Sequence, residues 1–133
     1  MKISAAIRNA PSRHEVVVST GGSEQSLAVP PKPSGQGSNV NGGEFLMLAL
    51  ATCYCNDLYR EAARLGIPIE SVEVEASAEF PGIGLAATNI AYRAKVSSAA
   101  TPAEIAELLR VTDAVAEVHN TVRAGGPVTL EQP

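Results

Sequence analysis

Apolar and polar residues alternate in three short stretches near the start of the chain. Residues 3–7 carry Ile or Ala at every second position, residues 14–19 contain three consecutive valines, and residues 26–29 follow a pair of glycines. Alternation with a period of two is typical of half-buried strands, and a Gly-Gly pair marks a turn between strands. The pattern predicts three short strands, followed by a loop rich in Pro and Gly at residues 30–39.

The strictest alternation lies at residues 69–80, where apolar side chains share one face and glutamates occupy the other. Residues 90–96 repeat this pattern after a Pro-Gly-Ile-Gly turn, with Arg93 and Lys95 on the polar face. Opposite charges attract each other directly across paired strands. The two stretches therefore predict an antiparallel hairpin whose basic residues face the glutamates.

A helical period begins at about Gly43 and continues to Leu65, where Gly66 and Pro68 end the helix. The first half of this helix is apolar almost all round, so we expect a sheet and a second subunit to cover it. One stripe at helical spacing is expected to form the core side: Leu48, Ala51, Cys55, Leu58, Ala62 and Leu65.

A second helix is expected from Thr101, since Thr101 can cap it, Pro102 suits its first position and Glu104 completes a capping box. This helix is expected to end near Ala124, and residues 127–130 predict a last strand. The element order β-β-β-α-β-β-α-β over residues 1–133 predicts one α+β domain.

Composition excludes several classes of protein. The net charge is −4 and no basic patch appears, which argues against nucleic-acid binding. No apolar run approaches the roughly 20 residues of a membrane-spanning helix. Arg8 and Pro11 interrupt the start of the chain, unlike a signal peptide. We therefore expect a cytoplasmic protein that contacts neither nucleic acid nor membrane.

Cys53 and Cys55 are the only cysteines and lie on the same predicted helix. Two positions along a helix correspond to about 200° of rotation, so the two thiols cannot form a disulfide with each other. Cys55 is expected in the core, and Cys53 is the candidate reactive thiol. A reactive thiol needs a nearby cation, whereas Asp57, one turn away, would raise its pKa. Arg60 lies two turns away on the same side of the helix, so a cation from elsewhere in the chain is required, and the candidates are Arg13, Arg93 and Arg123.

Other candidate sites carry weaker signals. His119 could pair with Cys53 for nucleophilic catalysis, although a lone histidine is more often structural. The two cysteines and two histidines match no zinc spacing, and the Gly-rich loop lacks the P-loop lysine. We therefore expect neither a metal nor a cofactor.

Two motifs resemble the OsmC/Ohr family. Residues 41–53 (NGGEFLMLALATC) are similar to the xPxELLxxALAxC run at the start of the family's central helix. Residues 119–128 (HNTVRAGGPV) are similar to its second signature, CPVxNTLRxGxPV. The resemblance implies an intertwined homodimer in which two central helices pack between antiparallel sheets. It also implies reduction of hydroperoxides by a peroxidatic and a resolving cysteine, with a dithiol reductant, at the dimer interface.

Residue by residue, the resemblance assigns Cys53 to the peroxidatic cysteine and Glu44 to an acidic position that many members share. It places Ala116 where the resolving cysteine is expected. Gly43 falls where the organic hydroperoxide reductases carry the glutamate that orients the catalytic arginine.

Two functions therefore stay open at the level of sequence. The first is an atypical hydroperoxide reductase that uses Cys53 and an external thiol. The second is a dimeric domain that has lost turnover and binds a small apolar ligand or a protein partner.

Overall fold

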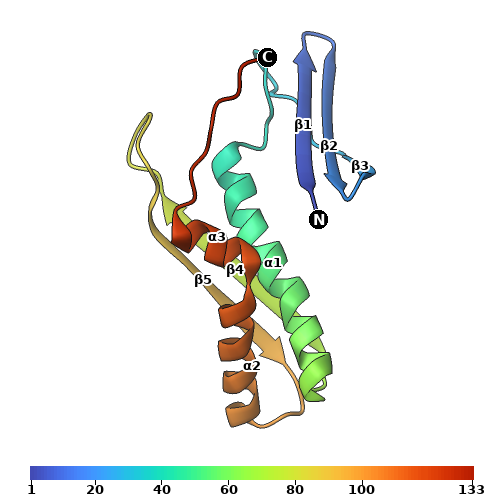
Figure 1. Ribbon diagram of the computed structural model, residues 1–133, viewed down its shortest axis with the longest axis vertical. Coiled ribbons are helices and arrows are strands. Elements are labelled where there is room, and N and C mark those ends of the chain that lie inside the picture. Colours follow the sequence, from blue (N-terminus) through green and yellow to red (C-terminus); the bar gives the residue numbers. More distant parts are fainter. The chain divides into compact units, whose positions relative to one another are not determined.

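Residues 1–45 and residues 46–133 form two units in the computed structural model, which describes the whole chain (Figure 1). The first unit holds an antiparallel sheet in the order β1 (Ile3–Ala10), β2 (Arg13–Thr20) and β3 (Ser23–Leu27). The second unit holds most of α1 (Gly42–Leu65), followed by β4 (Ser71–Glu79), β5 (Thr88–Ser97), α2 (Pro102–Val115) and α3 (Glu117–Ala124).

A two-residue turn joins β2 to β3. Gly21 and Gly22 have φ angles of 57° and 87°, in the left-handed region that glycine enters at little cost. The turn places Thr20 opposite Ser23 and so sets the register of the pair. The three predicted strands are confirmed, although the third begins three residues earlier and ends two residues earlier than expected, because its pairing starts directly at the turn.

Asn41 and Glu44 start α1 through reciprocal hydrogen bonds. The Asn41 side chain accepts from the Glu44 backbone N–H at 2.8 Å, and the Glu44 carboxylate accepts from the Asn41 N–H at 3.0 Å. This capping box satisfies two backbone donors that the first turn leaves free. The predicted extent of the helix is confirmed, and Gly66 follows its end with a φ of 69°.

The second unit is built on an antiparallel hairpin of β4 and β5, as predicted. Glu75 lies opposite Arg93, and their side chains form an ion pair at 2.6 Å. The apolar side chains of the hairpin lie on its other face. They pack against a buried cluster of helical residues, namely Tyr54, Leu58, Ala62, Leu108 and Ala116. Helices therefore cover one face of the hairpin (Figure 1).

The buried face of α1 differs from the predicted stripe. Leu50, Tyr54 and Leu58 are buried, whereas Leu48 is 56% exposed. Cys55 is only partly buried and lies outside the core cluster, so its predicted core position is wrong. The physical reason is Tyr54, whose ring packs edge-on against Tyr92 of the hairpin with centroids 4.6 Å apart. Burying this large ring turns the Cys55 side of the helix away from the hairpin.

Two helices, α2 and α3, replace the single second helix that the sequence predicts. Ala116 is fully buried and has a ψ of 104°, which interrupts the helix. Side chains of α3 satisfy carbonyl groups at the end of α2: Asn120 donates to Ala114 O at 3.1 Å, and Arg123 donates to Asp113 O at 3.4 Å.

Of the two predictions made for the ends of this C-terminal region, one is confirmed and one is wrong. The predicted cap is confirmed, since Thr101 Oγ1 accepts from the Glu104 N–H at 3.2 Å. The strand predicted at residues 127–130 is wrong, because these residues have no paired strand to bond their backbone groups. No helix combines the length and the apolar composition needed to cross a bilayer.

Candidate functional site

Cys53 lies in the middle of α1 and faces two carboxylates. Its thiol lies 3.7 Å from Asp57 Oδ2, one turn along the helix, and 3.9 Å from Glu117 Oε2 at the start of α3. The thiol is partly buried and packs beside the core cluster. The break at Ala116 makes this arrangement, because it brings the first turn of α3 against α1.

The surroundings of Cys53 disfavour its thiolate. Burial raises the pKa of the Cys53 thiol, and the charges of Asp57 and Glu117 raise it further. The Val118 backbone lowers this pKa but does not reverse the direction. Since the thiolate is the nucleophile, the site holds Cys53 in its less reactive form.

Arg60 is the cation of this region, and it binds the carboxylates. Its guanidinium lies 3.0 Å from Asp57 Oδ1, 3.5 Å from Glu61 Oε2 and 3.9 Å from Glu117 Oε1. Asp57 is buried, and burial raises the pKa of this carboxyl while Arg60 lowers it. The positive charge therefore compensates buried acid groups and makes no hydrogen bond to the thiol.

The donor atoms of Cys53, Asp57 and Glu117 lie within 4.8 Å of one another, a spacing that could hold a cation. Arg60 already supplies positive charge to both carboxylates. The chain's own arginine therefore offsets one of the two carboxylate charges.

The other residues that the sequence offered as helpers of Cys53 are bonded elsewhere. Arg13 pairs with Glu15 at 2.8 Å, Arg93 pairs with Glu75, and Arg123 pairs with Asp113 at 2.6 Å. Glu44 serves the capping box of α1. Both cysteines are free, and Ala116 contributes only to the core.

His119 does not pair with Cys53. Its ring packs against Tyr92, with centroids 4.4 Å apart, and against Tyr54 at 5.8 Å. Only 3% of the residue is exposed, and neither ring nitrogen has a hydrogen-bond partner. Burial, followed by the charge of Arg123, lowers the pKa of His119, so the imidazole is held neutral.

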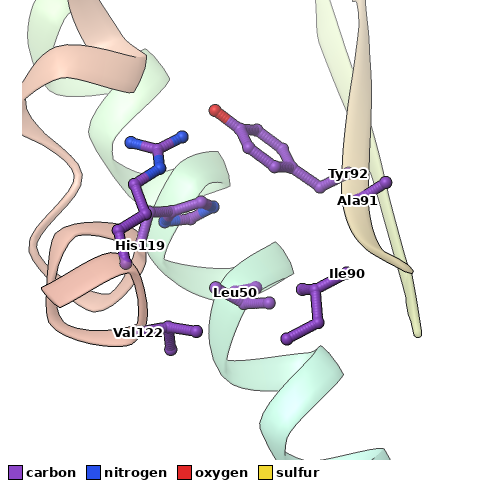
Figure 2. Close-up of a pocket in the computed structure, with 7 residues that line it drawn as sticks. Leu50, Ile90, Ala91, Tyr92, His119 and Val122 are labelled. Carbon is purple, nitrogen blue, oxygen red and sulfur yellow. The ribbon is translucent and has the colours of Figure 1, made fainter. Parts of the chain in front are cut away.

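A cavity of about 500 Å³ lies beside His119, between α1, β5 and α3 (Figure 2). Figure 2 shows Leu50, Ile90 and Val122 around this space, with the Tyr92 and His119 rings on its wall. Its lining is therefore mostly apolar, with Arg123 as its charged member. Cys53 is not among the lining residues, although Leu50 lies one turn before it on α1.

Polar groups at the rim of the cavity satisfy one another. Tyr92 donates a hydrogen bond to Asp113, which also pairs with Arg123. Burial and the bond to Asp113 raise the pKa of Tyr92, while that bond and Arg123 hold the pKa of Asp113 below its usual range. Asp113 thus remains ionised. Its bonds fix the positions of two cavity residues, Tyr92 of β5 and Arg123 of α3.

Sequence patterns do not reveal Glu117 or Asp113 as site residues. Both depend on the break at Ala116, which no glycine or proline marks. In the single helix expected there, Asp113 and Arg123 are ten positions apart and would not meet.

These features define an α+β protein with a partly buried thiol on a central helix, Cys53, which faces two carboxylates, and with an apolar cavity nearby. The family model for OsmC-like proteins matches residues 35–131, and the chain belongs to this family. The resemblance found in the sequence is therefore confirmed. A comparison with curated proteins finds no match.

Solved structures show the same fold. The chain is similar to an OsmC-like protein from Mycoplasma pneumoniae, with a TM-score of 0.65 and 18% identity over 92% of this chain and 86% of the other. It is also similar to an organic hydroperoxide resistance protein from Elizabethkingia anophelis, with a TM-score of 0.63 and 16% identity over 92% of this chain and 89% of the other. A third similar structure is an organic hydroperoxide resistance protein OsmC from Legionella pneumophila, with a TM-score of 0.60, 18% identity, and coverage of 90% and 89%. At these identities the likeness establishes the fold alone.

Proposed function

We propose that this OsmC-family protein binds a small, largely apolar molecule in the cavity between α1, β5 and α3. The observation that carries this proposal is the cavity itself, about 500 Å³ in volume and lined by residues such as Leu50, Ile90 and Val122. Ligand sites in proteins are typically concave and apolar, with few polar groups that orient the ligand. In this cavity the polar residues are Tyr92, His119 and Arg123.

The surroundings of Cys53 support binding over rapid peroxide turnover. Its raised pKa lowers the fraction of nucleophilic thiolate, and the nearest cation, Arg60, is engaged by carboxylates. No second cysteine stands at Ala116 to resolve an oxidised thiol. Each of these properties would slow a peroxidase, and none hinders ligand binding in the cavity.

Toluene is a suitable first probe because it is apolar and small enough for the cavity. Saturable chemical-shift changes at Leu50 and Val122 are expected in a titration followed by NMR. The Val122→Phe variant should fill part of the space and weaken binding at least tenfold. Val115→Phe is the matched control, because Val115 is exposed and outside the cavity. Toluene binding that is absent, or equal in both variants, would overturn the proposal.

A second candidate function is slow hydroperoxide reduction at Cys53 with an external thiol. Family membership and the partial exposure of Cys53 favour it. The thiolate would attack the peroxide to give a sulfenic acid and an alcohol. Two molecules of external thiol would then return the cysteine and leave as a disulfide, with release of water.

A peroxide-consumption assay separates this second candidate from ligand binding alone. Turnover should depend on Cys53 and on the added thiol, and should survive Cys55→Ser. Equal rates for the wild type and Cys53→Ser would exclude the peroxidase. Toluene binding should be unaffected by Cys53→Ser, since Cys53 does not line the cavity.

We also propose that the protein is a homodimer. Leu48 and Tyr59 are 56% and 48% exposed, and their spacing places them on one face of α1 together with Cys55. An apolar helix face of this kind requires a covering surface. Light scattering should give twice the mass of the chain, and Leu48→Glu should shift the protein toward a monomer. A wild type that is monomeric at high concentration would contradict this proposal.

A further inference from the structure

His119 is a buried polar residue without a polar partner. Neither ring nitrogen makes a hydrogen bond, and both are covered against bulk solvent. Buried polar groups in folded proteins nearly always have a partner, because leaving one unpaired costs free energy. An unpaired histidine on the wall of a cavity therefore needs a physical explanation.

The neighbouring polar groups are already committed to other partners. The Tyr54 hydroxyl donates to Leu109 O at 2.7 Å, and the Tyr92 hydroxyl donates to Asp113. Arg123 is held by Asp113 and by Asn120 at 3.2 Å. The imidazole packs against the Tyr54 and Tyr92 rings and also lines the cavity, where Figure 2 shows it together with Tyr92.

We propose that His119 binds the polar head of the ligand in this cavity, and that this head is an uncharged hydroxyl group. The inference rests on the proposed function, because it names the chemical class of the molecule that the cavity takes. The ligand would be a small alcohol, with its apolar part against Leu50, Ile90 and Val122.

The hydroxyl group follows from the protonation state of the imidazole. Burial keeps His119 neutral, so one ring nitrogen is a donor and the other an acceptor. A hydroxyl both donates and accepts, and it can therefore pair with either ring nitrogen. A carboxylate can only accept, and its charge would lie beside a neutral ring in an apolar space.

The only positive charge on the cavity wall is already balanced. Arg123 would have to leave Asp113 to pair with an anionic ligand, which would leave Asp113 without its ion pair. An alcohol requires no such exchange. Because both nitrogens are covered, the imidazole has to turn about its Cβ–Cγ bond to meet the hydroxyl, and this motion should change its NMR signals.

Three probes that share one aromatic ring test the inference: toluene, benzyl alcohol and benzoate. Calorimetric titrations at pH 8 should show that the wild type binds benzyl alcohol at least tenfold more tightly than benzoate. His119→Leu should lower the affinity for benzyl alcohol relative to that for toluene about fivefold, the worth of one ordinary neutral hydrogen bond. His119→Gln keeps a donor and an acceptor and should restore part of the loss. His14→Leu is the control histidine variant.

A measurement on the unmodified protein guards against misfolding of the variants. The ¹⁵N signals of the His119 ring should shift on adding benzyl alcohol, and by less on adding toluene. If toluene binds but His119→Leu leaves benzyl alcohol unaffected, the inference is overturned and the proposed function stands. Tighter binding of benzoate would also overturn it, in favour of an anion site. If no probe binds the wild type, both the inference and the proposed function fail.

Discussion

Removing the charge of Asp57 should make Cys53 more reactive. The change is Asp57→Asn, which keeps the shape of the side chain and removes the negative charge 3.7 Å from the sulfur. The carboxylate disfavours the thiolate, so its loss should increase the thiolate fraction at any pH below the thiol's pKa. The same change frees Arg60 from its 3.0 Å ion pair, and the released cation acts in the same direction.

The size of this effect follows from Coulomb's law. Two unit charges 3.7 Å apart interact by about 1 kcal/mol in a water-like dielectric and by about 4 kcal/mol in the dielectric typical of a protein surface. Arg60 already offsets part of the Asp57 charge, so the lower figure is the appropriate one. An energy of about 1 kcal/mol corresponds to roughly fivefold more thiolate.

Alkylation by iodoacetamide at pH 8 measures this fraction, because only the thiolate reacts. Mass spectrometry can follow the rate in a Cys55→Ser background, in which Cys53 is the only thiol. Asp57→Asn should react about fivefold faster than its parent. Glu107→Gln is a matched control, because Glu107 forms a similar pair with Arg110 on α2, at 2.6 Å.

Equal alkylation rates for Asp57→Asn and its parent would refute the electrostatic reasoning. Burial alone would then account for the low reactivity of the thiol. A fivefold increase in both Asp57→Asn and Glu107→Gln would point to a change in net charge and contradict a local effect.

Three further predictions concern stability. Leu58→Ala should lower the free energy of unfolding by about 2–5 kcal/mol in a denaturant titration, because Leu58 is fully buried in the core cluster. Glu44→Ala should lower the free energy of unfolding by about 1 kcal/mol in the same titration, because it removes one half of the capping box. Glu44→Gln keeps the capping box and should leave the stability unchanged. A loss of peroxidase activity in a stable Glu44→Gln variant would instead indicate a catalytic role for Glu44. Folding lowers the pKa of His119, so the unfolded chain takes up a proton first and stability should fall as the pH drops below about 6.5. Acidification should therefore destabilise His119→Gln less than it destabilises His14→Gln, which keeps His119. An equal loss in both variants would contradict the role of His119 in this pH dependence.

Local signals predicted much of the fold. The alternation at β4 and β5, the cap at Thr101, and the end of α1 at Gly66 each depend on neighbours in sequence. These signals act through backbone geometry and short-range hydrogen bonds, which are the same in any tertiary context. The helix break at Ala116 carries no such signal, because its extended backbone is stabilised by packing and by side chains that cap α2.

The sequence by itself determined the α+β class, the family and the place of Cys53 on the central helix. It also determined which expected partners are missing, since Ala116 and Gly43 are read directly from the chain. Only the tertiary structure decided what surrounds the thiol and where a ligand could bind. Asp57 is a helical neighbour of Cys53 and was visible in the sequence, but Glu117 and the wall of the cavity come together through the packing of α3 against α1 and β5. Contacts between distant segments leave no periodic trace in a single sequence.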